Sequence, residues 1–310
     1  MPQRTSIGVI GLGWVGSSVA ISLLHSGSVN ELLVHDVREG LAEGEAMDLA
    51  HGSSFYPSAQ VRNSTVDEMS DTDAIVIAAG KGGTPGQTRL DLLQDNAIIL
   101  RELAQRLRGY KGLVVIVTNP VDVLTYVFTK ASGLAPERVI GTGTMLDTAR
   151  LRQILGRELN LDPRSIHAQV VGEHGDSEVT LWSSASVGGM PLRDWPGWNT
   201  ERELSVSREV RTAAQEIIKR KGATNHAIGL VTAALLRWMV RGERRVLTVS
   251  RVQSGALGLK DVALSLPTIV SLEGATQVIE PELDADERIQ LEHSASVLRK
   301  ATESLTPVRQ

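Results

Sequence analysis

The first half of the chain alternates short apolar runs with longer amphipathic stretches. Each apolar run has the length of a buried strand, and the runs are Ser6–Ile10, Glu31–His35, Asp73–Ala79, Leu113–Thr118 and Val139–Gly141. Arg89–Leu107 instead repeats leucine and alanine at helical spacing, which predicts an amphipathic helix. Because apolar strands that alternate with helices are typical of a parallel sheet covered on both faces, we expect a doubly wound α/β fold.

The pattern changes near Gly141–Thr144, where this alternation ends. We therefore expect two domains, residues 1–143 and residues 144–310. The second should contain helices at Met145–Leu159, Glu201–Val240 with breaks at Gly222 and Gly229, and Asp284–Leu305. Its expected strands are His167–Gly172, Val246–Ser250 and Thr268–Leu272. This mixture predicts an α+β domain.

Composition excludes several classes of function. The chain has 310 residues, which is long enough for two packed domains or one large one, and 42% of them are hydrophobic, which is enough to fill a core. Its formal net charge of −4 gives no electrostatic basis for binding nucleic acid or an anionic membrane. No apolar run has the length of a membrane span, and no signal-peptide pattern is present. Since cysteine is absent, there is no disulfide or thiolate ligand, and we expect a cytoplasmic protein without a metal site.

A glycine motif follows the first expected strand and precedes a helix expected at Ser17–His25. The pattern G-x-G-x-x-G gives a tight turn, lets the backbone approach a pyrophosphate, and lets helix pack on strand. It predicts a dinucleotide-binding (Rossmann) domain whose cofactor-binding residues here are Gly11, Gly13, Trp14, Val15 and Gly16.

An acidic residue ends the second expected strand. Asp36 lies about 20 residues after Gly16, where a carboxylate can bind the ribose hydroxyls. The same carboxylate would repel a 2′-phosphate, so the expected cofactor is NAD rather than NADP. The alternative interpretation is a structural glycine turn beside a solvated aspartate.

Groups suited to proton transfer and charge binding occur in "GTGTMLDTARLR" and "VVGEHGDSEV". Asp147 and Arg150 are three residues apart on an expected helix and so share one face. His174 stands among glycines just after an expected strand. A carboxylate beside a histidine stabilises its proton, and an arginine presents a planar fork to a carboxylate. The alternative is an ordinary helical ion pair and an unrelated loop histidine.

Over nearly its whole length the chain resembles the L-lactate/malate dehydrogenase family. The resemblance covers the glycine motif and four further segments in order: "TNPVDVLTY", "VIGTGTMLDTARLR", "DPRSIHAQVVGEHGDSEV" and "KGATNHAIG". Glu173, Thr144, Met145 and Thr224 are similar to the lactate-type bacterial members. The resemblance implies an NAD-dependent L-2-hydroxy-acid dehydrogenase that interconverts pyruvate and L-lactate.

The resemblance also implies individual roles. His174 would exchange a proton with the substrate oxygen while Asp147 orients it, and Arg150 would bind the substrate carboxylate. A loop would close over the substrate and bring Arg89 to polarise the carbonyl. The other residues implied in substrate or cofactor binding are Asn119, Thr224, Gly83, Ala79, Gly80 and Thr118.

The loop before Arg89 departs from the family pattern. Lactate enzymes carry a glutamine and malate enzymes an arginine at the position that contacts the substrate side chain, where this chain has Gly83 in Gly82-Gly83-Thr84. A second substrate carboxylate would lack a cation there, unless Lys81 supplies it. We therefore expect a neutral 2-oxo acid, pyruvate first and larger ones as co-substrates. His226, which replaces an aromatic residue of many lactate enzymes, leaves the pocket's size open.

Two alternatives remain besides lactate dehydrogenase: an L-malate dehydrogenase and a non-catalytic dinucleotide-binding protein. The second would be expected to lose His174, Asp147, Arg150 or Arg89, and all four are present. A related NAD-dependent glycosidase would usually need a cysteine–histidine metal site, which this chain cannot form.

Regulation and assembly are suggested by the resemblance alone. Arg152 and His167 match positions where many bacterial lactate dehydrogenases bind fructose bisphosphate at a subunit interface. The alternative interpretation is a surface helix residue and a histidine at the start of a strand. We expect a homo-oligomer, with a tetramer favoured over a dimer. For the two tryptophans of Arg193–Thr200 the interpretations are local packing or a subunit contact.

Overall fold

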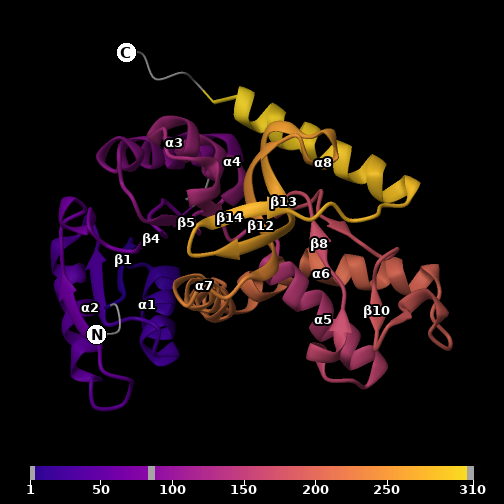
Figure 1. The fold of residues 1–310 in the computed structure, drawn as a ribbon, viewed down its shortest axis with the longest axis horizontal. Helices are drawn as coiled ribbons and strands as arrows, with labels where there is room; N and C mark the ends of the chain where they lie inside the picture. The colour runs from indigo at the N-terminus through magenta and orange to yellow at the C-terminus, as the bar shows by residue number, and fades with distance from the viewer. Residues whose placement is uncertain (1–3, 83–87, 306–310) are drawn as a thin grey trace.

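The computed structural model describes residues 4–82 and 88–305, and its centre is one large twisted sheet (Figure 1). Six parallel strands take the order β3-β2-β1-β4-β5-β6. Their bounds are β1 Ser6–Ile10, β2 Glu31–His35, β3 Gln60–Asn63, β4 Ala74–Ile77, β5 Leu113–Ile116 and β6 Val139–Gly141. This is the doubly wound arrangement expected from the apolar runs, which confirms the fold class.

Strands from the second half of the chain continue the same sheet. β12 (Arg245–Ser254) pairs antiparallel with β6, and β13 (Lys260–Ser271) and β14 (Gly274–Val278) follow. Among the described residues the sheet thus has nine strands, and it crosses the position where the sequence pattern changes.

Helices cover both faces of the sheet because its strands are apolar on both sides. In β4, Ala74 and Val76 face one hydrophobic core, while Ile75 and Ile77 face another. The helices of the first core are α1 (Trp14–Ser26), α2 (Glu39–His51) and α7 (His226–Val240). Those of the second are α3 (Arg89–Arg106), α4 (Val121–Ser132) and α8 (Ala285–Glu303).

A third hydrophobic core lies in the second half of the chain. It is formed mainly by α5 (Met145–Leu159), α6 (Thr200–Lys221), β7 (Ile166–His167) and Val170 of β8 (Val170–Val171), and Val187 of β10 (Ser186–Val187) packs against it. The other short strands of this half are β9 (Val179–Thr180) and β11 (Met190–Pro191). Trp198 is buried in this core, with its ring 5.8 Å from that of Trp182. Local packing therefore accounts for this tryptophan.

Two sequence-based expectations about this half were wrong. The strand expected at His167–Gly172 is divided into β7 and β8, which belong to different sheets, because Thr148 of α5 and Thr144, the residue that precedes α5, bind the backbone N–H and carbonyl of Val170. Gly229 does not break a helix but lies inside α7. There a Cβ atom would be 2.6 Å from the Ser18 carbonyl oxygen, so the glycine permits close packing of α7 on α1.

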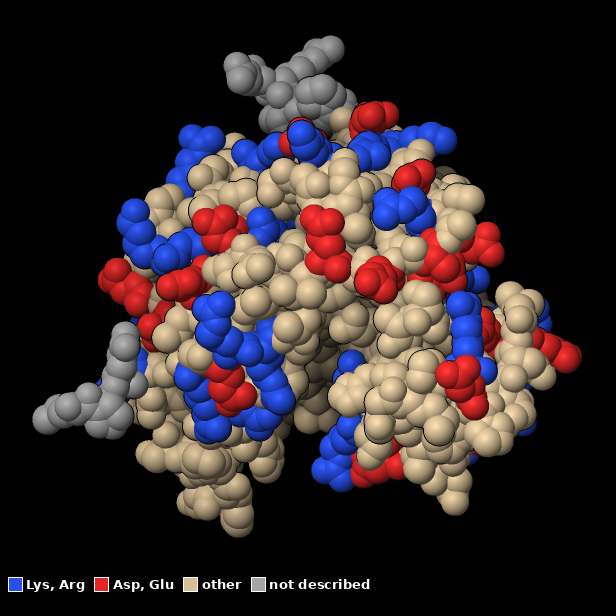
Figure 2. Space-filling view, turned by 45° about the vertical axis from the view of Figure 1, so that its right-hand side comes forward, with Lys and Arg blue, Asp and Glu red and all other residues tan. Residues whose placement is uncertain are grey.

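None of the helices in the described part of the chain is long and apolar enough to cross a membrane. The surface charge is uneven: Figure 2 shows one face hollowed near its centre, with Lys and Arg side chains on both sides of the hollow. A net charge of −4 therefore coexists with local basic regions.

Candidate active site

The glycine motif forms the turn between β1 and α1. Gly11 has φ +92°, and a Cβ atom there would lie 2.4 Å from the Ala79 backbone nitrogen. A Cβ atom at Gly16 would lie 1.7 Å from the Gly11 carbonyl oxygen. At Gly13, by contrast, a Cβ atom would meet no described atom within 4 Å. Two glycines are thus needed for packing, while the third leaves the start of α1 open to a ligand.

A cavity of about 660 Å³ adjoins this turn. It is bordered by Gly13, Trp14 and Ser17 of the first turn, by Glu45 and Asp48 of α2, and by Asn225 and His226 at the start of α7, with Arg38 at its edge. Among residues 4–82 and 88–305, no side chain caps the α1 N-terminus, so its N–H groups are available to an anion. The space and its donors fit the nucleotide half of NAD.

The Asp36 carboxylate is hydrogen-bonded to two residues that border this cavity, Leu12 and Arg38. Its Oδ2 accepts a hydrogen bond from the Leu12 N–H at 2.8 Å, and its Oδ1 accepts from the Arg38 N–H at 3.0 Å. Burial acts to raise the pKa of Asp36, but the Arg38 side chain and the backbone donors outweigh burial and lower it. Asp36 is therefore an anion fixed at the end of β2.

The segments after β4 and β5 are bound together at the same edge of the sheet. Thr118 Oγ1 donates to the Ala79 carbonyl at 2.7 Å, and a Cβ atom at Gly80 would lie 2.6 Å from the Thr118 methyl group. The buried Asn96 of α3 accepts from the Lys81 N–H and donates to the Asn119 carbonyl. Asn119 is thus held at the carboxyl ends of the strands, where ligands bind in open α/β sheets.

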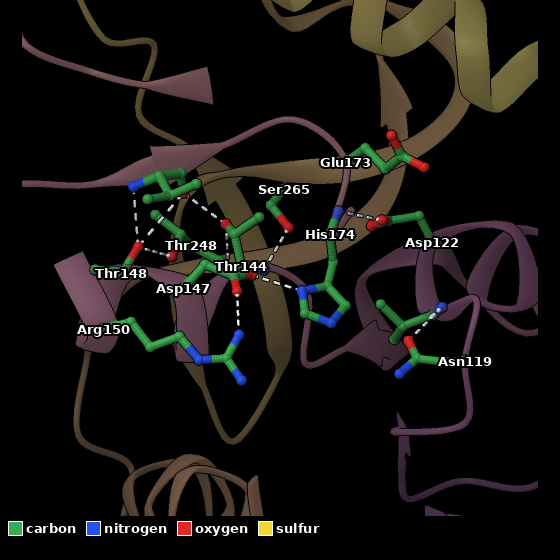
Figure 3. Close-up of polar contacts among 12 residues, drawn as sticks. Asn119, Asp122, Thr144, Asp147, Thr148, Arg150, Glu173, His174, Thr248 and Ser265 are labelled. Carbon is green, nitrogen blue, oxygen red and sulfur yellow. Dashed lines mark hydrogen bonds and ion pairs between the residues drawn. The ribbon is translucent and has the colours of Figure 1, made fainter. Parts of the chain in front are cut away.

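One buried carboxylate, Asp147, connects two cationic side chains (Figure 3). Its Oδ2 is 2.5 Å from His174 Nδ1, and its Oδ1 accepts from Arg150 Nη1 at 2.8 Å. Asp147 and Arg150 come from the first two turns of α5, and His174 from the loop between β8 and β9. In the view of Figure 3 the His174 ring lies between Arg150 and Asn119.

The Asp147–His174 pair determines the protonation of both partners. Burial disfavours the His174 cation, but the adjacent Asp147 charge outweighs burial and raises the pKa of His174 to about 9. Burial would likewise raise the pKa of Asp147, but His174 and Arg150 outweigh it and lower that pKa. At neutral pH the site holds an imidazolium on a carboxylate, a proton donor with a fixed orientation.

Two family models together match nearly the whole chain. Residues 5–141 match the family model of the lactate/malate dehydrogenase NAD binding domain, and residues 144–307 match that of the lactate/malate dehydrogenase alpha/beta C-terminal domain. The chain belongs to the lactate/malate dehydrogenase family. The resemblance seen in the motifs and the expected NAD-binding domain are therefore confirmed.

Relatives within the lactate/malate dehydrogenase family are similar over their full length. The L-lactate dehydrogenase of Synechococcus sp. (strain JA-3-3Ab) is 41% identical over 300 residues, which are 96% of this chain and 98% of the relative. That of Salinibacter ruber is 42% identical over 313 residues, 99% of each chain. The crystal structure of a minor L-lactate dehydrogenase from Enterococcus mundtii superposes with a TM-score of 0.95 at 36% identity, covering 98% of this chain and 99% of that one.

The family motifs did not single out two buried acids of the site. Asp122 of α4 is 1% exposed and its Oδ2 accepts from the His174 N–H at 2.7 Å, so it fixes the backbone of the loop that carries His174. Burial raises its pKa to about 6. Glu178 is 4% exposed, and burial followed by the Asp147 charge raises its pKa to about 8. A charged residue inside the apolar run "NPVDVLTY" was the signal available for Asp122.

For all but one of the other expected site residues, the structure gives a position in the fold. Gly83 lies outside the described residues, and Arg89 is the first residue of α3. Thr224 lies between α6 and α7 and is partly buried. His226 borders the 660 Å³ cavity on the nucleotide side. The Lys81 ammonium pairs with Asp95 of α3 at 3.1 Å.

The structure describes both of the expected effector residues. Arg152 is partly buried, donates from Nε to the Ala168 carbonyl at 3.0 Å, and borders a surface cavity of about 280 Å³. His167 is exposed on β7, where it pairs with Ser186. Burial lowers the pKa of Arg152. Arg152 is thus bound to the backbone of the residue that follows His167.

Proposed function

We propose that this protein is an NAD-dependent L-lactate dehydrogenase that reduces pyruvate to L-lactate and catalyses the reverse reaction. The observation that carries the proposal is the Asp147 carboxylate, which holds a proton-donating histidine and an arginine suited to a carboxylate. Interconversion of a 2-oxo acid and a 2-hydroxy acid needs a group that exchanges a proton with the substrate oxygen and a cation that binds the substrate carboxylate, both beside the group that carries the hydride. The names of the full-length relatives support the same substrate.

The cofactor would occupy the cavity beside the glycine turn. Gly13 leaves space for a pyrophosphate at the start of α1, and Asp36 lies at the ribose position. The remaining expected contacts, on the nicotinamide side, are Ala79, Gly80, Thr118 and Asn119. When bound, NAD supplies the hydride acceptor for lactate oxidation and, in reduced form, the hydride donor for pyruvate reduction.

Side chains of the protein would donate the proton to the substrate and bind its carboxylate. Since Asp147 holds His174 Nδ1, the opposite ring nitrogen, Nε2, would donate its proton to the pyruvate carbonyl oxygen during reduction. Arg150 uses Nη1 on Asp147, and its other N–H donors would bind the substrate carboxylate. Arg89 would polarise the carbonyl as its loop closes, and Thr224 would line the pocket.

A neutral substrate side chain is favoured over a second carboxylate. Gly83 offers no cation, and the Lys81 ammonium is paired with Asp95. Buried without a cation, the second carboxylate of oxaloacetate would cost several kcal/mol. We expect a Gly83→Gln variant to discriminate more strongly between pyruvate and larger 2-oxo acids, measured as the ratio of their kcat/KM values. Unchanged ratios would contradict this role for the position.

NADH oxidation by the purified protein tests the function directly. The assay compares pyruvate, oxaloacetate and 2-oxoisocaproate at equal concentrations, each with and without fructose bisphosphate. We expect the highest kcat/KM with pyruvate. A preference for oxaloacetate would replace the lactate assignment by a malate one, and no oxidation with any of them would favour the non-catalytic alternative.

We further infer a cytoplasmic homo-oligomer, with a tetramer favoured, in which residues 1–143 serve the cofactor and residues 144–310 the substrate. Exposed Leu230 and Val246 border the 280 Å³ cavity together with Trp238 and Arg152, which supports a subunit contact on this face. Fructose bisphosphate would bind Arg152 and His167 of two neighbouring subunits. Sedimentation analysis with and without the effector tests both inferences, and an unchanged monomer would contradict them.

A further inference from the structure

Asp36, the acid proposed to bind the ribose, forms an ion pair with Arg38. Arg38 Nε lies 3.0 Å from Asp36 Oδ1, and Arg38 Nη2 lies 3.4 Å from Asp36 Oδ2. The Asp36 side chain is 7% exposed and that of Arg38 is 66% exposed. Of the two, so far as residues 4–82 and 88–305 show, it is Arg38 that borders the 660 Å³ cavity.

This arrangement changes the charge that a cofactor meets at the ribose. A bare carboxylate at the end of β2 binds the 2′-hydroxyl of NAD and repels the 2′-phosphate of NADP, whereas an arginine nearby accommodates that phosphate. The guanidinium fork also binds phosphate oxygens through two parallel hydrogen bonds. Because the Arg38 side chain is mostly exposed, it can turn from Asp36 to a ligand, while the buried Asp36 carboxylate keeps its hydrogen bonds from the Leu12 and Arg38 backbone N–H groups.

We propose that the cofactor site accepts NADPH as well as NADH, and that Arg38 is the residue that binds the 2′-phosphate. This inference rests on the proposed function, because it concerns the same dinucleotide site. Three carboxylates oppose the phosphate: Asp36 itself, and Glu45 and Asp48 of α2, which border the cavity. NADH therefore remains the preferred cofactor, and Arg38 reduces the preference rather than reversing it.

Direct binding separates this inference from the proposed function. NADH and NADPH share the fluorescent nicotinamide, so the dissociation constant of each is obtained by titration without substrate. The variants are Arg38→Ala, Arg38→Lys and the control Arg62→Ala. Arg62 carries the same charge and pairs with Glu31 at 3.0 Å, but lies on β3 outside the residues that border the cavity.

We expect NADPH to bind the natural protein and Arg38→Ala to weaken NADPH by about tenfold or more, since a charge-assisted contact to phosphate is lost. NADH should change far less, Arg38→Lys should restore part of the NADPH affinity, and Arg62→Ala should alter neither cofactor. Added salt should weaken NADPH more than NADH.

Failure takes two distinguishable forms. If neither cofactor binds, the proposed function falls together with this inference. If NADH binds and NADPH does not, or if Arg38→Ala affects both cofactors equally or not at all, the role of Arg38 is wrong while the proposed function stands.

Discussion

The cofactor half and the catalytic half of the site are built by different means. Around the nucleotide cavity, backbone does most of the construction: Gly11 and Gly16 pack where no side chain fits, and Gly13 leaves the helix start open. At the catalytic centre, side chains from α4, α5 and the loop after β8 meet around Asp147. The cofactor half depends on the absence of side chains at a few neighbouring glycines. The catalytic half depends on charged side chains that the fold brings together from distant parts of the chain.

The largest expected effect is on the catalytic half. His174→Ala should lower kcat by about 10²–10⁴-fold, the usual contribution of a positioned acid–base group. NADH binding, which depends on the other half, should remain. Stopped-flow single turnovers and NADH titration measure the two effects, and a full rate in the variant would remove His174 from the mechanism.

A pH profile tests the charge that Asp147 places beside His174. Pyruvate reduction needs the protonated histidine, so kcat/KM should be constant below pH 9 and fall as the pH rises through about 9, the pKa of His174. In Asp147→Asn the negative charge that raises the pKa of His174 is absent. The pH at which kcat/KM falls should therefore move down towards 6.5, the ordinary pKa of histidine. The rate at pH 8 should then drop by more than about tenfold. An unmoved profile would assign the titration to another group.

Paired glycine substitutions test whether packing and ligand space are separate in the cofactor half. Gly16→Ala places a methyl group against the Gly11 carbonyl and should destabilise the fold by about 1–3 kcal/mol, measured by urea unfolding. Gly13→Ala meets no described atom and should leave the unfolding free energy nearly unchanged, but weaken NADH binding. Equal loss of stability in both variants would contradict the distinction.

The last comparison concerns Asp122, whose conservative variant has the smallest expected effect. Asp122→Ala removes the acceptor of the His174 N–H and should cost about 1–3 kcal/mol of unfolding free energy, with a lower kcat. Asp122→Asn keeps an acceptor oxygen and should lose less of both. If the two variants were equally impaired, the charge of Asp122 rather than its hydrogen bond would be what matters.

The same contrast explains what could be predicted from the sequence. β1, β2 and β6 were predicted with the bounds that the structure has, because buried strands carry a local apolar pattern. His174 and Asp147 were singled out by motif, and the structure brings them within 2.5 Å. The roles of Gly83, Arg89 and Thr224 stay predictions.

What could not be predicted depends on contacts distant in the chain. Asp122 and His174 are 52 residues apart, so no local pattern links them. Gly229 has the composition of a helix break, and only the closeness of Ser18 explains it as a packing position. The division of β7 from β8 follows from hydrogen bonds of Val170 to Thr144 and Thr148, more than 20 residues earlier in the chain.

The shared sheet has a consequence for the modularity of this enzyme. β6 is covered along its outer edge by β12, and α1 is covered by α7, which packs on it through Gly229. A fragment that ended at residue 143 would expose both an unpaired strand edge and an apolar helix face, which favour aggregation. A chimera that exchanges cofactor domains between dehydrogenases therefore has to carry α7 and β12–β14 along with residues 1–143. The elements that complete the sheet and the packing of the cofactor domain are close to it in space but distant from it along the chain.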